Sequence, residues 1–69
     1  MKYVELKYDK ENSSENDSVY IIVDKYDDEL GRVYYYSKWR KYVFEPHEST
    51  FYDWKCLNEI SDLIKELKK

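Results

Sequence analysis

The side chains of this 69-residue chain that could support catalysis are one histidine, one cysteine and a set of carboxylates. His47 lies between Glu45 and Glu48, and such a group could bind a metal or exchange protons. Neighbouring side chains in a turn after Pro46 point in different directions, so we interpret this group as a solvated loop. Cys56 falls on the apolar side of a predicted helix, where a thiol usually packs as a small core residue.

The chain also lacks the residue sets that metal, phosphate and acid–base sites require. One cysteine and one histidine cannot supply the four ligands of a structural zinc site, and one cysteine cannot form a disulfide within the chain. The sequence has no glycine-rich phosphate loop. The carboxylates fall at exposed positions without the pairing of a glycosidase. We therefore expect no enzymatic activity, no catalytic residues, no metal and no cofactor.

Two segments in the first half of the chain have strand patterns. Residues 3–8 alternate apolar and charged side chains, which is typical of a half-buried strand. Residues 18–26 are β-branched and apolar almost throughout, which suits a central strand. Residues 9–17 between them contain no apolar side chain and predict a mobile, solvated loop.

The aromatic segment 32–45 is too long for one ordinary strand. We predict a turn near residues 37–40 that divides it into strands 32–37 and 41–45, after which Pro46 prevents further pairing. The preceding segment DDELG ends on the only glycine of the chain. It therefore predicts a hairpin loop whose glycine adopts positive φ.

Residues 51–67 have the pattern of one amphipathic helix, and Thr50 followed by Asp53 resembles a capping box at its start. Phe51 and Trp54 fall outside the apolar side. We expect them to fold back over the Pro46 corner as a hydrophobic plug, and presentation to a partner is the alternative. The apolar side itself spans an arc of about 120° and contains Cys56, Leu57, Ile60, Leu63, Ile64 and Leu67.

These elements predict a single α+β domain over residues 1–69. A small antiparallel sheet of three to four strands is followed by one C-terminal amphipathic helix packed on one face. A helix of this length is about 25 Å long and about 10 Å wide, so it can cover only one face of the sheet. The other face must then meet solvent or a partner.

The hairpin loop sets a predicted register in which Val19, Ile21 and Val23 share a face with Val33 and Tyr35. The second face would then be aromatic and would have no helix of its own. Tyrosine is enriched at interfaces because its ring buries area while its hydroxyl stays hydrogen-bonded. We predict a partner-binding surface made of Tyr20, Ile22, Tyr34, Tyr36, Lys38, Trp39, Arg40 and Lys41.

Charge and size leave two alternative functions open. Residues 1–30 carry nine acidic and four basic side chains, which argues against phosphate-dominated DNA binding. Cations alternate with aromatic rings over residues 36–42, so a binder of single-stranded nucleic acid is one alternative. A homodimer is the other, because so small a domain without a disulfide or a metal gains stability by self-association. No segment reads as a signal peptide or a membrane span, so we expect a cytoplasmic protein.

The second half of the chain has a pattern made of Trp39, Tyr42, Val43, Phe44 and Pro46, then Thr50, Phe51, Cys56, Leu57, Ile60 and Ile64. In this pattern it resembles a group of very short uncharacterised bacterial and phage-related proteins. The resemblance covers residues 33–65 and implies a fold without an assigned activity. With the small size and the acidity, it implies a phage or mobile-element product. We therefore predict a non-enzymatic protein-binding module, an inhibitor of a host defence or nucleic-acid enzyme.

Overall fold

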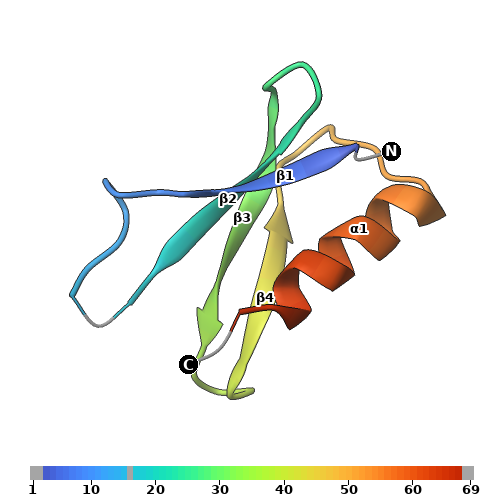
Figure 1. Cartoon of the computed structure of the whole chain (residues 1–69). Coiled ribbons are helices and arrows are strands. Elements are labelled where there is room, and N and C mark those ends of the chain that lie inside the picture. Colours follow the sequence, from blue (N-terminus) through green and yellow to red (C-terminus); the bar gives the residue numbers. More distant parts are fainter. Residues whose placement is uncertain (1–2, 16, 68–69) are drawn as a thin grey trace.

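The computed structural model describes residues 3–15 and 17–67, and within them it contains a four-stranded antiparallel sheet and one helix (Figure 1). The strands lie in chain order across the sheet, and the helix packs against one face (Figure 1). This confirms the predicted α+β fold. The elements are β1 (Val4–Tyr8), β2 (Val19–Asp24), β3 (Glu29–Tyr36), β4 (Lys41–Pro46) and α1 (Trp54–Lys65).

The hydrophobic core lies between α1 and the sheet face that it covers. Four buried residues form its centre: Val4, Ile22, Val33 and Ile60. Ile22 and Val33 are fully buried on the two central strands. Half-buried side chains surround them, including Leu63 and Ile64 from the later turns of α1. The helix thus shields one face only, as its width requires.

The predicted turn over residues 37–40 is present and joins β3 to β4. The predicted role of Gly31 is wrong, because Gly31 lies within β3 and has no positive φ. Asp27 adopts the left-handed conformation instead, with φ 67°. The Asp24 carboxylate accepts hydrogen bonds from the backbone N–H groups of Tyr26 and Asp28, which holds this turn. Strand β3 consequently starts at Glu29, three residues earlier than predicted.

The predicted register of β2 against β3 is also wrong, and a bulge explains the error. Val23 pairs with Glu29, but the next partner of β2 is Ile22 with Gly31, so Leu30 is an extra residue on β3. Without this bulge, the pairing that starts at Val23 and Glu29 would continue until Val19 paired with Val33, and these two residues would share a face as predicted. One extra residue exchanges the two faces of a strand relative to its neighbour. Tyr20 therefore pairs with Val33 and shares its face.

Helix α1 begins at Trp54, three residues later than predicted, and ends at Lys65 rather than at residue 67. Asp53 is the N-cap, and its Oδ1 accepts a hydrogen bond from the Cys56 N–H at 2.9 Å. The Thr50 hydroxyl does not cap the helix. It donates instead to the His47 carbonyl at 2.8 Å, which ties the chain down before the helix starts.

The Asp53 cap predicts a pH dependence of stability. The hydrogen bond from the Cys56 backbone lowers the pKa of Asp53 below its usual value of about 3.9. A carboxylate with a lowered pKa stabilises the fold above the unfolded-state pKa, and this contribution is lost as pH falls through the folded-state pKa. Asp53→Asn keeps an oxygen acceptor but cannot titrate. The Tm difference between the wild type and Asp53→Asn should therefore change as pH falls below about 4.

Thermal unfolding followed by circular dichroism over a pH series checks this expectation. The wild type should lose Tm relative to Asp53→Asn between neutral and acid pH, because only the wild type protonates its cap. Asp53→Ala, which lacks an acceptor, should unfold at a lower temperature at neutral pH. A Tm difference between wild type and Asp53→Asn that stays constant with pH would contradict the cap's role.

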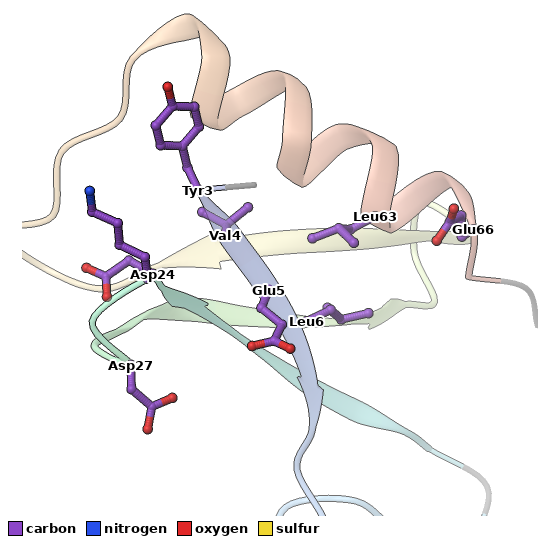
Figure 2. A pocket seen from close by; sticks show the side chains of 9 residues that line it. Tyr3, Val4, Glu5, Leu6, Asp24, Asp27, Leu63 and Glu66 are labelled. Carbon is purple, nitrogen blue, oxygen red and sulfur yellow. The ribbon is translucent and has the colours of Figure 1, made fainter. Parts of the chain in front are cut away.

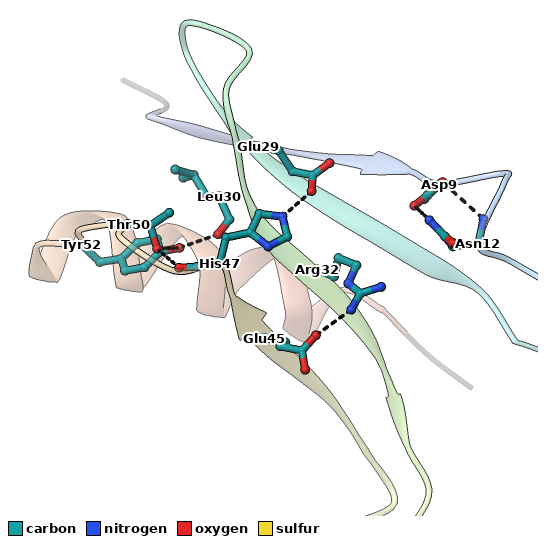
Figure 3. A network of polar contacts seen from close by, with 9 residues as sticks. All are labelled: Asp9, Asn12, Glu29, Leu30, Arg32, Glu45, His47, Thr50 and Tyr52. Atoms are coloured by element: carbon teal, nitrogen blue, oxygen red, sulfur yellow. Dashed lines mark hydrogen bonds and ion pairs between the residues drawn. The ribbon is translucent and has the colours of Figure 1, made fainter.

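The polar segment between β1 and β2 carries a local hydrogen-bond network in its described residues. The Ser13 hydroxyl accepts from the Val19 N–H at 2.8 Å and donates to the Asp9 carbonyl at 2.6 Å. Asn12 donates its side-chain amide to the Asp9 carboxylate at 2.6 Å (Figure 3). These short-range bonds bring the chain back to β2. Residue 16 of the predicted loop lies outside the described residues.

Candidate partner-binding face

The sheet face opposite α1 is called the open face here, because no helix covers it in the part of the chain that the structure describes. Its composition follows from the strand register, since paired residues share a face. β-Branched and aromatic side chains from β2, β3 and β4 occupy its centre, with charged residues around them. The open face consists of Glu5, Lys7, Val19, Ile21, Val23, Arg32, Tyr34, Tyr36, Lys41, Val43 and Glu45.

A groove of about 410 Å³ runs along β3 and β4 on this face, and it is called the aromatic groove here. Tyr34, Tyr36 and Val43 line it together with Trp39 from the β3–β4 turn and Pro46. The rings of Tyr36 and Trp39 meet edge to face, with centroids 5.4 Å apart. Trp39 is 67% exposed. Its ring is therefore held in place by one tyrosine and remains available for contact.

Ion pairs surround the apolar centre of the open face. Arg32 Nη2 contacts Glu45 Oε1 at 2.9 Å between β3 and β4 (Figure 3). Lys7 Nζ contacts Asp27 Oδ1 at 2.7 Å beyond β1, and this carboxylate raises the pKa of Lys7. Solvent-exposed pairs of this kind add little to stability. Their main effect is to give the apolar centre a polar rim, an arrangement that is typical of binding surfaces.

His47 is not simply a solvated loop residue, as the sequence suggested. Its Nε2 pairs with the Glu29 carboxylate, and its backbone N–H donates to the Leu30 carbonyl at 2.8 Å (Figure 3). The side chain thus joins the segment after β4 to the start of β3. The predicted neighbours do not gather around it, because Glu45 pairs with Arg32 instead. His47 therefore has a structural partner and no catalytic one among these residues.

The structure divides the predicted partner-binding residues between the two faces. Tyr34, Tyr36 and Trp39 come together in the aromatic groove. Tyr20 and Ile22 do not join them, because the bulge turns both toward α1, where Ile22 is fully buried and Tyr20 packs against the core.

The cationic members of the prediction lie at the tip of the β3–β4 hairpin. Lys38 and Arg40 are exposed in the turn, and Lys41 is exposed at the start of β4. The sequence interpretation missed four apolar residues of the open face: Val19, Ile21, Val23 and Val43. The alternation within β2 groups Val19 with Ile21, but only the bulge decides which face they occupy.

The predicted plug of Phe51 and Trp54 is wrong, because these side chains are 91% and 68% exposed. Tyr52 takes that place. Its ring packs edge to face on Phe44 at 5.6 Å, and its hydroxyl donates to the Leu30 carbonyl at 2.9 Å. The late start of α1 explains the exchange. Phe51 belongs to an extended segment in which neighbouring side chains alternate, so only Tyr52 turns inward.

Cys56 is half-buried near the start of α1 and lies outside the core, as does Leu57, which is 51% exposed. Both were predicted to be core residues. Burial raises the pKa of the Cys56 thiol, and the Asp53 carboxylate raises it further. A raised pKa keeps the thiol protonated at neutral pH and weakens it as a nucleophile. The apolar stripe of α1 that reaches the core thus begins at Ile60.

A second cavity of about 580 Å³ lies between β1 and the last turns of α1 (Figure 2). Its apolar lining includes Val4 and Leu63. The carboxylates of Asp24, Asp27 and Glu66 also line it, but they point in different directions (Figure 2). Within the described residues, no group of three His, Cys, Asp or Glu side chains could hold a metal ion. This cavity therefore offers no convergent set of reactive groups.

Comparison of the chain with protein-family models, with curated proteins and with solved structures finds no match. Over the described residues, the structure has no helix with the length and hydrophobicity needed to cross a membrane.

Proposed function

We propose that this chain is a non-enzymatic protein-binding module whose partner binds the open face at the aromatic groove. The observation that supports this is the gathering of Tyr34, Tyr36 and Trp39 with Val43 on a sheet face without a covering layer. Exposed apolar patches with a polar rim are typical of protein-binding sites. Tyrosine, tryptophan and arginine supply most of the binding energy at such sites.

The geometry of the groove suits a rigid partner surface. Tyr36 and Trp39 hold each other edge to face, so little side-chain freedom is lost when a partner packs on them. The hydroxyl of Tyr34 lies 3.5 Å from Glu45 Oε2, at the edge of the polar rim. A partner can therefore bury the rings while the polar groups keep hydrogen bonds at the border.

We further propose that binding is stoichiometric and blocks a larger protein, such as a host defence or nucleic-acid enzyme. The small size and the resemblance to phage-related proteins support this part of the proposal. The acidic first half of the chain supports it as well, since it would be attracted to a basic nucleic-acid channel.

The double variant Tyr34→Thr/Tyr36→Thr tests the proposed surface. Threonine keeps a high strand preference, so the sheet should tolerate it. We expect the Kd for the partner to rise by about 30-fold or more, the equivalent of about 2 kcal/mol for hot-spot rings. We expect the Tm to fall by no more than about 4–8 °C. Capture of the partner from host lysate, followed by titration with the purified partner, measures the first effect.

Tyr26→Thr is the matched control, because Tyr26 is 73% exposed and lies in the β2–β3 turn, outside the open face. It should leave both the Kd and the Tm unchanged. Unchanged partner binding by the double variant would overturn the proposal. Unfolding of the double variant would show that these two rings support the sheet rather than a partner.

A further inference from the structure

A cationic pocket of about 360 Å³ lies between the β3–β4 hairpin and the end of α1, on the face opposite the aromatic groove. It is called the hairpin-tip pocket here. Its lining includes Tyr35, Arg40, Tyr42, Ile64 and Lys65. Lys41 also lines it at the hairpin tip, although its pairing with Tyr36 assigns it to the open face.

The three cations of this pocket are available to a ligand. In the described part of the chain, Arg40, Lys41 and Lys65 form no ion pair, whereas Lys7 and Arg32 on the open face are both paired. The C-terminus of a helix carries only about half a negative charge. Three full positive charges outweigh it, so the pocket attracts anions although the whole chain has a net charge of −3.

Aromatic and apolar surface lies beside these cations. The rings of Tyr35 and Tyr42 pack edge to face with centroids 5.6 Å apart, and Ile64 lines the pocket from α1. A planar ring system can stack or pack here while an attached anionic group meets the cations. The pocket thus combines the two features that bind single-stranded nucleic acid.

The backbone of Arg40 adds a second observation. Arg40 adopts the left-handed conformation, with φ 55°, at the last position of the turn. Glycine or asparagine occupies this conformation with less strain. Arg40 therefore both closes the turn and lines the pocket with its long cationic side chain.

We propose that the hairpin-tip pocket binds single-stranded nucleic acid, with Arg40, Lys41 and Lys65 on the phosphates and the tyrosine pair against a base. An acidic peptide would use the cations but would leave the aromatic surface without a ring to stack. This site is separate from the aromatic groove. It therefore does not depend on the proposed protein partner.

Fluorescence anisotropy with a short labelled oligothymidylate, measured over a salt series, tests this inference. Each neutralised phosphate contributes about −0.7 to the slope of log K against log salt. The full-length protein should therefore show a slope of about −2, and Arg40→Ala/Lys65→Ala should reduce it to about −0.7. The same double variant should raise the Kd by about tenfold or more at low salt.

Lys25→Ala/Lys55→Ala is the matched control, because it removes the same charge from residues that line no part of this pocket. It should bind the oligonucleotide within about twofold of wild type. Equal weakening by both double variants would overturn the inference, as would tighter binding of an oligoglutamate peptide than of the oligonucleotide. Tyr34→Thr/Tyr36→Thr should retain oligonucleotide binding, which distinguishes failure of this site from failure of the protein-binding face.

Discussion

Gly31→Ala is expected to destabilise the protein by about 3 kcal/mol or more, the upper range for overpacking a closed site. A Cβ at this position would lie 2.4 Å from the Glu45 carbonyl oxygen, 2.7 Å from Phe44 Cε1 and 2.9 Å from Pro46 Cα. Two of these atoms belong to the backbone, so a change of rotamer cannot relieve the clash. The strand pairing between β3 and β4 must open instead, and this pairing also positions the aromatic groove.

Denaturant unfolding followed by circular dichroism measures this effect, with Ser37→Ala in the exposed turn as the control. Where no clash exists, replacement of glycine by alanine commonly stabilises a protein by about 0.4–1 kcal/mol, because it restricts the unfolded chain. The expected sign at Gly31 is the opposite. Equal or greater stability of Gly31→Ala would show that the close approach of β4 is absent.

Ile22→Ala is expected to cost about 2–5 kcal/mol, whereas Ile21→Ala should cost about 1 kcal/mol. Ile22 is fully buried beneath α1. Ile21 is half-buried on the open face between Lys7 and Arg32. The substitutions remove the same atoms from adjacent positions, so the difference reports which face of β2 meets the helix. Equilibrium unfolding curves in denaturant measure both free-energy losses.

The order of these two values decides the register. A larger loss for Ile21→Ala would contradict the bulge at Leu30 and would restore the faces that the sequence predicted. Partner binding offers an independent readout, since Ile21 lies on the open face and Ile22 does not.

The bulge shows why the elements were predictable from the sequence but the faces were not. Hydrophobic alternation located β1 and β2, and the need for a turn in the aromatic segment located the β3–β4 hairpin. Residues 29–31 alternate as a strand whether or not Leu30 is an extra residue. The choice depends on the close approach of β4 to Gly31, which is a contact between distant parts of the chain.

The prediction of which aromatic residue fills the corner before α1 was wrong for a similar reason. Three aromatic residues, Phe51, Tyr52 and Trp54, lie within four positions of the sequence, and each has enough apolar surface to fill the corner. Tyr52 occupies it because its hydroxyl also reaches the Leu30 carbonyl and the Thr50 hydroxyl. No sequence spacing shows that the Leu30 carbonyl accepts a second hydrogen bond besides the one from the His47 N–H.

The sequence indicated part of the aromatic groove. Tyr34, Tyr36 and Trp39 lie close together because a hairpin turn at residues 37–40 brings them to one end of the sheet, and their role in binding stays a prediction. Val43 joins them through its pairing with Tyr34, which only the β3–β4 register fixes. The sequence interpretation grouped Arg40 and Lys41 with this surface, whereas the structure places Arg40 at the pocket beside α1. Lys41 belongs to the open face through its pairing with Tyr36 and also lines that pocket.

Photo-crosslinking from the centre of the open face tests the central claim most directly. Benzoylphenylalanine would replace Tyr34 in one version of the full chain and Tyr26 in another, and both would be expressed in host cells. We predict that position 34 forms one adduct with a larger protein and that position 26 forms none. Equal adducts at both positions, or an adduct at position 34 only with a second copy of this chain, would contradict the claim that the open face binds another protein.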